Sequence, residues 1–252
     1  MISVPANVAT VGLSRCPALV LVGGLGTRLR RAYADGPKTL APVAGKPFLA
    51  HLFKLLADNG VPRVVLCLGY RAGQIERWLA DAGNFDLDIH CSQEDEPLGT
   101  AGALGLAYTR YARGERVLAM NGDSILHLPL GSMWNAHTAC AAEATVALAR
   151  VPDTSRYGSV EVNEEGWVTS FREKSPEPAP GFGFINGGVY LFEPSVMDRV
   201  VRDGYRSLEC EVLPAQIARG LLAFKSDGYF IDIGVPQDLA RAQSELGAVV
   251  SL

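Results

Sequence analysis

A glycine-rich turn that follows an apolar run constrains this chain more than any other feature. Residues 18–22 are apolar, and residues 23–29 read Gly-Gly-Leu-Gly-Thr-Arg-Leu. Glycine permits positive φ angles and a close approach of the backbone to a ligand, so the amides of such a turn can converge on an anion. Arg28 adds a positive charge at the turn, and Lys38 adds another ten residues later. The stretch predicts a strand and loop that bind the phosphates of a nucleoside triphosphate.

The spacing of this turn excludes two common phosphate-binding motifs. A P-loop requires Gly-x-x-x-x-Gly-Lys-Ser/Thr, which does not occur in the chain. The dinucleotide fingerprint requires a third glycine where the chain has Leu29. Taken alone, the turn has an alternative interpretation as a tight strand-to-helix connection with a solvated arginine. Residues further along the chain favour the nucleotide site.

Composition and charge exclude several classes of protein. The 252 residues are 48% hydrophobic and 20% charged, as in a soluble globular protein. A net charge of −4 argues against general affinity for nucleic acid or anionic membranes, and no stretch approaches the ~20 apolar residues of a membrane span. Residues 1–15 lack the pattern of a secretory signal, so we expect a short N-terminal extension on a cytoplasmic protein. The five scattered cysteines are expected to be reduced, with Cys67 and Cys91 buried in strands.

Alternating strand and helix patterns in the first half predict an α/β fold. Residues 63–68 and 116–120 are apolar runs rich in branched side chains, typical of strands buried on both faces. Helical periodicity lies between them at Leu49, Leu52, Phe53 and Leu56, and again at Ile75, Trp78, Leu79 and Ala82. The first helix is expected to begin near Pro47 and to end before Gly60, and the second to end at Gly83. Right-handed βαβ units of this kind predict a Rossmann-like, mostly parallel sheet with helices on both faces.

After about residue 150 the pattern becomes β-rich. Residues 158–163 and 167–171 alternate around a turn at 164–166, which predicts a β-hairpin. Further strands are expected at 184–192 and 221–226, and a last helix from Pro236. This half therefore predicts a β-rich lid region beside the first.

Two aspartates predict a metal site near the phosphates. Asn121-Gly122-Asp123 directly follows a predicted strand, and ligands of open parallel sheets gather at the carboxyl ends of strands. Asp232 is flanked by apolar residues, and a buried lone carboxylate is costly unless it is paired, protonated or bound to a metal. Two carboxylates beside a triphosphate suit Mg²⁺, which prefers hard oxygen ligands and keeps several waters. The alternative for each is an aspartate satisfied in a turn or cap.

Two further loops carry small residues that admit a ligand. Glu94 opens a loop that ends in Pro-Leu-Gly-Thr at 97–100, which admits a planar base, and Thr100 is placed to cap the following helix. The alternative is a solvated acidic loop. Asn186 and Gly187 suit hydrogen bonding to a polyol, with a β-bulge as the alternative.

Glu173 and Lys174 end a predicted strand ahead of a proline-rich segment at 175–181, which predicts a loop over a site. Without context the two residues are a surface ion pair.

Together these motifs resemble the sugar-phosphate nucleotidyltransferase family. The family pattern runs Gly-Gly-x-Gly-Thr-Arg-Leu, a Pro-Lys segment, Pro-Leu-Gly-Thr-Ala, Gly-Asp after a strand, Glu-Lys, Asn-x-Gly and a late Asp-Ile-Gly. All of these occur here in order, across residues 22–238, which is far more specific than any single motif. The variants at 156–158, 185–190 and 229–239 most resemble bacterial D-glycero-D-manno-heptose 1-phosphate guanylyltransferases.

The resemblance implies a role for each matching residue. Nucleotide binding is implied for Gly23, Gly24, Leu25, Gly26, Thr27, Arg28, Lys38, Glu94, Pro97, Leu98, Gly99, Thr100 and Gly122, with the base at Glu94 to Thr100. Sugar binding is implied for Asn121, Glu173, Lys174, Asn186 and Gly187, with Lys174 on the sugar phosphate. Asp123 and Asp232 would bind Mg²⁺, and the catalytic residues would be Arg28, Lys38, Asp123 and Lys174. Residues 16–252 are then one domain, with a nucleotide-binding part at about 16–150 and a sugar-binding part at about 151–235.

The implied reaction transfers GMP from GTP to D-glycero-α-D-manno-heptose 1-phosphate, giving GDP-heptose and pyrophosphate for surface polysaccharide. Mannose 1-phosphate, or another sugar 1-phosphate with UTP or dTTP, is an alternative substrate. A catalytically idle paralogue that senses nucleotide sugars is a further alternative. Members of the family often dimerise, so a homodimer is an open expectation. Thr39, Arg31 and Val235 depart from the family pattern without removing a charged group that the chemistry needs.

Overall fold

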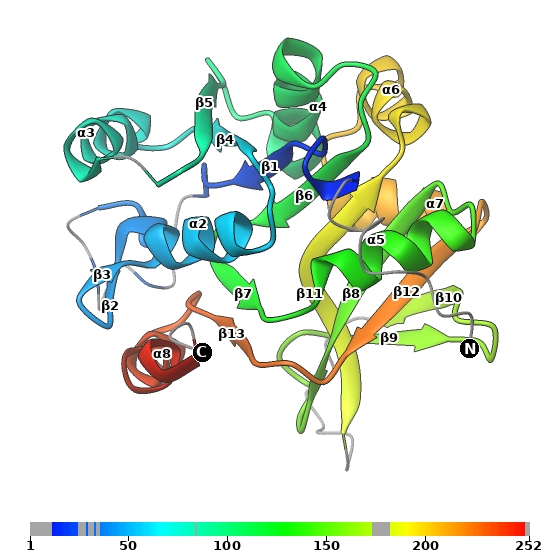
Figure 1. Ribbon diagram of the computed structural model, residues 1–252. Coiled ribbons are helices and arrows are strands. Elements are labelled where there is room, and N and C mark those ends of the chain that lie inside the picture. The colour runs from blue at the N-terminus through cyan, green and yellow to red at the C-terminus, as the bar shows by residue number, and fades with distance from the viewer. Residues whose placement is uncertain are drawn as a thin grey trace.

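The computed structural model of the protein describes residues 12–24, 29, 33, 36–83, 85–172 and 182–249. Its strands are β1 (Ala18–Leu21), β2 (Pro42–Val43), β3 (Lys46–Pro47), β4 (Arg63–Leu68), β5 (Asp88–Gln93), β6 (Val117–Asn121), β7 (Ser124–Leu126), β8 (Ala144–Val151), β9 (Ser159–Val162), β10 (Val168–Arg172), β11 (Gly183–Phe192), β12 (Leu221–Ser226) and β13 (Phe230–Asp232). Its helices are α2 (Phe48–Asp58), α3 (Ala72–Ala82), α4 (Gly99–Tyr111), α5 (Leu130–Ala139), α6 (Pro194–Asp203), α7 (Leu213–Ile217) and α8 (Pro236–Val249), with a 3₁₀ turn η1 (Lys38–Leu40) and a π-helical turn η2 (Leu208–Val212) (Figure 1).

A seven-stranded sheet runs through the protein in the order β12-β8-β11-β6-β1-β4-β5. β1 lies between β4 and β6 and is parallel to both, β4 is parallel to β5, and β8 is parallel to β12. Only β11 is antiparallel to its neighbours within this sheet. The predicted, mostly parallel sheet is therefore confirmed. Because β4, β1 and β6 are neighbours that point the same way, their carboxyl ends lie together at one end of the sheet.

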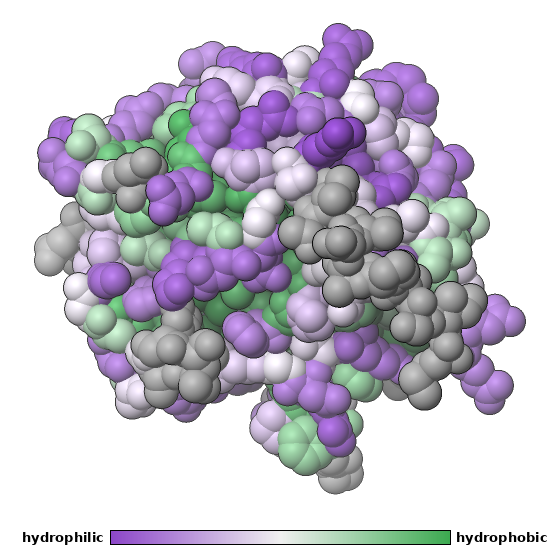
Figure 2. Space-filling model, in the orientation of Figure 1, coloured by the Kyte–Doolittle hydropathy of each residue, from purple (hydrophilic) through white to green (hydrophobic). Residues whose placement is uncertain are grey.

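Helices cover both faces of this sheet, as predicted (Figure 1). Alternate residues of a strand enter two separate cores. Val20 and Leu66 pack in the core that holds α2, α5 and α8, whereas Leu19 and Val65 pack in the core that holds α4 and α6. On the side shown in Figure 2, hydrophilic side chains cover most of the outline and hydrophobic ones lie in recesses between them. None of the described helices combines the length and apolar character needed to cross a bilayer.

The two helices predicted in the first half begin and end close to the expected residues. The four apolar residues that predicted α2 are fully buried. Gly60 follows α2 with φ +73°, and Gly83 ends α3 with φ +82°. Glycine adopts such positive φ angles at little steric cost because it has no Cβ atom. The periodicity and the glycine stops therefore located both helices.

The β-rich second half is divided between the central sheet and a separate hairpin. β9 and β10 pair antiparallel, which confirms the predicted hairpin, and the Trp167 N–H donates to Asn163 Oδ1 at 2.8 Å in its turn. β11 and β12 join the central sheet beside the strands of the first half. The predicted proline-rich loop lies outside the described residues and stays a prediction.

β11 contains a bulge at the segment that also suggested polyol binding. Its pairing with β8 shifts register between Asn186 and Tyr190. Asn186 Oδ1 accepts the Gly188 N–H at 3.0 Å, and Asn186 Nδ2 donates to the Tyr190 hydroxyl at 2.8 Å. Gly188 has φ +72°, and a methyl group there would lie 2.9 Å from both Asn121 Nδ2 and Ser124 Oγ. The bulge therefore brings β11 against the end of β6.

All five cysteines are free. Cys16 and Cys67 are buried and Cys91 is half-buried, so the predicted burial of Cys91 is only partial. Cys140 and Cys210 are exposed. Burial raises the pKa of the Cys16 thiol to about 12, and burial together with the charge of Glu94 raises the pKa of the Cys67 thiol.

We expect Gly188→Ala to destabilise the protein more than Gly60→Ala. Both positions have positive φ, which costs an alanine about 1–2 kcal/mol. Only Gly188 also meets neighbouring atoms, whereas nothing lies within 4 Å of a methyl group at Gly60. The crowding adds about 1–3 kcal/mol to the loss of unfolding free energy, measured by urea denaturation. Equal losses for the two variants would show that β11 does not press on the end of β6.

We expect maleimide to label Cys140 and Cys210 quickly in the native protein and to leave Cys16 and Cys67 unlabelled. The thiolate is the reactive form, and a raised pKa keeps the buried thiols protonated even at pH 9. Mass spectrometry after labelling at pH 7 and pH 9, with and without urea, measures this. Labelling of Cys67 in the native state at either pH contradicts its burial.

Candidate nucleotide-binding site

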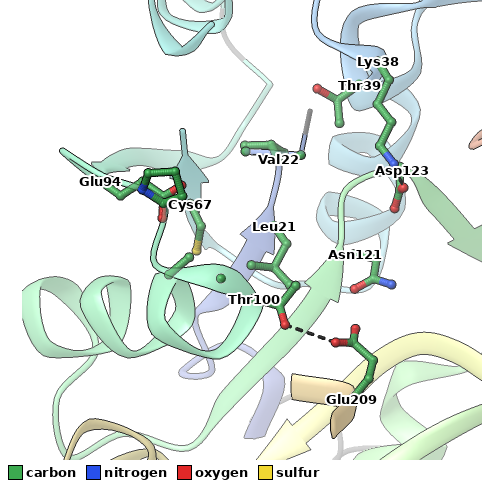
Figure 3. Close-up of a pocket in the computed structure, with 15 residues that line it drawn as sticks. Leu21, Val22, Lys38, Thr39, Cys67, Glu94, Thr100, Asn121, Asp123 and Glu209 are labelled. Atoms are coloured by element: carbon green, nitrogen blue, oxygen red, sulfur yellow. Dashed lines mark hydrogen bonds and ion pairs between the residues drawn. The ribbon is translucent and has the colours of Figure 1, made fainter. Parts of the chain in front are cut away.

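A cavity of about 370 Å³ lies at the carboxyl ends of β1, β4 and β6 (Figure 3). Its walls come from segments that are far apart in the sequence: the end of β1, η1, the loop after β5, the start of α4, the end of β6 and η2. The lining residues are Leu21, Val22, Gly23, Gly24, Lys38, Thr39, Cys67, Glu94, Pro97, Gly99, Thr100, Ala103, Asn121, Asp123 and Glu209. Most of the described residues predicted to bind the nucleotide thus line one cavity.

Close packing of the loops explains two of the glycines. A methyl group at Gly23 would lie 2.9 Å from the Gly69 nitrogen, and one at Gly122 would lie 2.6 Å from the Leu21 oxygen. These glycines let the loops after β1, β4 and β6 approach one another. Gly122 therefore supports the wall without lining the cavity. The remaining residues of the predicted phosphate loop, Leu25, Gly26, Thr27 and Arg28, lie outside the described residues, and their roles stay predictions.

Lys38 and Asp123 form an ion pair inside the cavity (Figure 3). Their side chains are 18% and 21% exposed, so each charge has lost most of its water and depends on its partner. A lysine in this place can neutralise a phosphate, and the carboxylate can bind a metal ion. Thr39, next in the chain, is fully buried in the cavity wall, and its hydroxyl has no hydrogen-bond partner among the described residues.

Asp232 lies next to Asp123 through the backbone. β13 pairs antiparallel with β7 so that Asp232 is opposite Ser124, and the Ile233 N–H donates to the Asp123 carbonyl at 3.0 Å. Asp232 Oδ1 accepts the Gly234 N–H at 2.6 Å. Asp232 is half-buried and does not line the cavity.

The two aspartates fit a magnesium ion better than a metal held wholly by the protein. Within the described ranges no group of three or more histidine, cysteine, aspartate or glutamate side chains could hold a metal. Mg²⁺ is commonly bound by one or two carboxylates, with phosphate oxygens and waters completing its six positions. Asp123 and Asp232 would supply those carboxylates, with Asp123 Oδ2 exchanging its bond with Lys38 for the ion, while Asp232 Oδ1 accepts the Gly234 N–H.

The loop after β5 holds a carboxylate in a fixed position. Glu94 donates its backbone N–H to the Leu68 carbonyl at 3.0 Å, and its Oε2 accepts the Leu98 N–H at 2.9 Å. A methyl group at Gly69 would lie 2.5 Å from Glu94 Oε1. Leu98 thus orients Glu94 instead of lining the cavity. One carboxylate oxygen of Glu94 is fixed by the loop, and the residue lines the cavity.

The predicted helix cap at Thr100 is wrong. No side chain caps α4, whose cap position is Leu98, because Thr100 lies within the first turn. Thr100 Oγ1 instead accepts the Leu208 N–H at 2.8 Å and donates to Glu209 Oε2 at 3.1 Å. Gly99 has φ +79°, and a methyl group there would collide with the Arg206 carbonyl. The start of α4 is therefore locked against the segment before α7.

Of the residues predicted to bind the sugar, one lines the cavity, two lie outside it, and two are outside the described residues. Asn121, at the end of β6, lines the cavity. Asn186 and Gly187 do not line it: the Asn186 amide bonds within the β11 bulge, and a methyl group at Gly187 would lie 2.6 Å from Leu126 Cδ2. Glu173 and Lys174 lie outside the described residues.

Sequence reasoning missed Glu209 and the cavity role of Cys67. Cys67 was expected to be a buried thiol, and it is, but its place near the carboxyl end of β4 also puts it in the cavity wall. Glu209 lies in no recognisable motif, and only the tertiary contact of η2 with α4 brings it to the site. The signal for Cys67 was its position at a strand end, whereas Glu209 had none.

Comparison with known sequences places these features in a family. The family model described as Nucleotidyl transferase matches residues 17–248. A D-glycero-alpha-D-manno-heptose 1-phosphate guanylyltransferase of Aneurinibacillus thermoaerophilus is 36% identical over 230 residues, which cover 91% of this chain and 97% of that protein. A mannose-1-phosphate guanylyltransferase of Mycobacterium tuberculosis is 35% identical over 232 residues, covering 91% of this chain but 64% of the relative.

Solved structures agree with this assignment. The crystal structure of HddC from Yersinia pseudotuberculosis aligns with a TM-score of 0.81 at 32% identity, covering 92% of this chain and 99% of HddC. HddC complexed with GMP-PN aligns with a TM-score of 0.80 at 31% identity and the same coverage. A putative glucose-1-phosphate thymidylyltransferase from Bacillus anthracis shares the fold, with a TM-score of 0.75 at 23% identity over 91% of this chain and 94% of that one. The chain belongs to the nucleotidyl transferase family.

Proposed function

We propose that this protein transfers GMP from GTP to a sugar 1-phosphate and releases pyrophosphate. The observation that carries the proposal is that the Lys38–Asp123 pair and the loop from Glu94 to Thr100 line the same cavity. The pair suits the phosphates, and the loop suits a base. Membership of the nucleotidyl transferase family and the similarity to two sugar 1-phosphate guanylyltransferases support it.

The reaction is an in-line displacement in which a phosphate oxygen of the sugar 1-phosphate attacks the α-phosphorus. That oxygen is already an anion, so no general base is needed. The obstacle is the approach of two anions, and catalysis is then mainly positioning and electrostatics. Lys38 neutralises phosphate charge, with Arg28 and Lys174 proposed for the same task. Mg²⁺ held by Asp123 and Asp232 would supply further positive charge at the phosphates.

The carboxylate of Glu94 favours guanine over the pyrimidine bases. An ionised carboxylate only accepts hydrogen bonds. Guanine offers two neighbouring donors, N1–H and the N2 amino group, whereas uracil and thymine offer one N–H between two carbonyl oxygens. With Oε2 already accepting the Leu98 N–H, Glu94 is held in place to meet donors from the cavity side. GTP is therefore the proposed donor.

D-glycero-α-D-manno-heptose 1-phosphate is the proposed acceptor, with GDP-heptose as product. Similarity to the heptose 1-phosphate guanylyltransferase, which is 36% identical over 91% of this chain, supports this choice. Mannose 1-phosphate remains the alternative acceptor because both relatives are about equally identical. Synthesis of surface polysaccharide in the cytoplasm is the proposed setting.

We expect Lys38→Ala and Asp123→Asn each to lower the rate of pyrophosphate release by roughly 10²–10³, as when one preorganised charge partner is removed. The assay combines each NTP with a panel of sugar 1-phosphates at saturating Mg²⁺. Asp227→Asn, at an exposed site, is the control that keeps full activity. Calorimetric binding of GTP without turnover by the wild type would instead identify a nucleotide sensor. Wild-type rates in both site variants would overturn the assignment.

We expect Glu94→Gln to lower kcat/KM for GTP by about 10- to 100-fold, since one bidentate base contact contributes about 1–3 kcal/mol. The amide keeps the bond to the Leu98 N–H but presents a donor toward guanine. The decrease in kcat/KM caused by Glu94→Gln should be smaller for ITP, which lacks the N2 amino group. Glu96→Gln, an exposed neighbour in the same loop, is the matched control. An unchanged ratio of GTP to UTP turnover in Glu94→Gln would show that another group selects the base.

A further inference from the structure

We propose that Glu209 is a specificity residue that recognises a pair of neighbouring hydroxyls on the substrate in the cavity. The diol belongs either to the ribose of the nucleotide or to the sugar 1-phosphate, and the experiment below separates the two. This inference rests on the proposed function, because it assumes that these substrates enter the cavity.

Glu209 reaches the cavity from a part of the chain distant from the other charged residues. It lies on η2, between α6 and α7, and lines the same cavity as Lys38, Asp123 and Glu94. Figure 3 shows it beside Thr100 and on the side away from Lys38 and Thr39. A carboxylate there is not a ligand for phosphate, since two anions repel. It suits a hydrogen-bond donor in the part of the ligand that is not phosphate.

The hydrogen bonds of Glu209 leave acceptor positions for a ligand. An ionised carboxylate has about four acceptor positions. Glu209 Oε2 accepts one bond, from Thr100 Oγ1 at 3.1 Å, and no basic side chain pairs with Glu209 among the described residues. Thr100 has only one hydroxyl proton, and it accepts the Leu208 N–H with its oxygen. Oε1 of Glu209 is thus left to accept from a ligand, and Oε2 can accept a second bond.

The backbone around Glu209 is fixed by bonds that Glu209 does not make. Glu211 Oε2 accepts the Arg206 N–H at 2.8 Å and the Ser207 N–H at 2.7 Å, and Ser207 Oγ accepts the Cys210 N–H at 3.0 Å. The Ala101 N–H donates to the Arg206 carbonyl at 3.0 Å, which joins the segment to α4. Of the two glutamates of η2, Glu211 holds the turn and Glu209 faces the cavity. A π-helical turn of this kind is frequently found at functional sites.

The vicinal diol fits this arrangement because it presents two donors at the spacing of two carboxylate oxygens. In dinucleotide-binding folds a carboxylate accepts a hydrogen bond from the ribose 2′-hydroxyl. The base amino group is the competing donor, and Glu94 already provides an acceptor at the base loop. Thr100 holds one oxygen of Glu209, so the carboxylate is oriented before the substrate arrives.

The test compares wild type, Glu209→Ala and Glu209→Gln in pyrophosphate release. One arm uses GTP against 2′-deoxy-GTP, 3′-deoxy-GTP and ITP. The other uses the accepted sugar 1-phosphate against its 2-deoxy and 3-deoxy analogues. We expect Glu209→Ala to raise KM about 10- to 100-fold for the hydroxylated substrate in one arm, as for a lost hydrogen bond to a charged group, and to leave its deoxy analogue unchanged. Glu209→Gln keeps one acceptor oxygen, so its KM for the hydroxylated substrate should lie between those of the wild type and Glu209→Ala.

Thermal melting of each variant and of the exposed control Glu96→Gln verifies folding. The proposal is overturned if Glu209→Ala still discriminates against the deoxy analogues. It is also overturned if KM rises equally for every substrate, or if the rise differs only between GTP and ITP. Turnover of GTP by the wild type decides the proposed function independently of Glu209. If the wild type shows no turnover, calorimetric affinities for the same nucleotides and sugar phosphates decide the role of Glu209 by the same criteria.

Discussion

The site depends on three loops that approach one another so closely that side chains do not fit between them. Neighbouring parallel strands end together, so the loops after β1, β4 and β6 must share one small region. Gly23 lies against Gly69, and Gly122 lies against the Leu21 carbonyl, with no room for a methyl group at either contact. The cavity opens where these loops meet the residues of η1 and α4. A larger residue at these contacts would separate the strands' ends and the polar groups that they carry.

The charge balance of the cavity follows from this confinement. Lys38 and Asp123 are both mostly removed from water, and an uncompensated charge in such a place is costly. Their ion pair balances the charges of these two side chains before a substrate binds, while Glu94 and Glu209 add negative charge to the lining. When substrates bind, Lys38 would exchange its bond with Asp123 for one with a phosphate, and Asp123 would exchange its bond with Lys38 for one with a cation. Neither side chain would then be left as an unpaired charge. Lys38 and Asp123 have therefore already lost most of their water before two anionic substrates bind, and their mutual attraction compensates for that loss.

Short-range sequence patterns predicted the strands, the hairpin and the helix ends, because these depend on residues close together in the chain. Residues 63–68 and 221–226 became β4 and β12 with the same bounds, and the hairpin and the glycine stops of two helices also agree. The partner of Thr100 and the place of Glu209 were not predictable, because they arise where η2 meets α4 with no motif at either end. From sequence alone, Asn186 and Gly187 were compatible with either polyol binding or a β-bulge. Only the register with β8 shows that the Asn186 amide is used within the strand.

The last part of the chain is joined to the first through backbone rather than side-chain contacts. β13 pairs with β7 outside the central sheet, and the Ile233 N–H binds the Asp123 carbonyl. The positions of the two aspartates are thus set by a ladder whose bonds do not involve their carboxylates. The ladder itself uses neither carboxylate: that of Asp123 pairs with Lys38, and Oδ1 of Asp232 accepts the Gly234 N–H. Asp232 reaches its place only when residues 230–232 pair with β7, so this late aspartate and the strand-end loops of the first half form one structural unit.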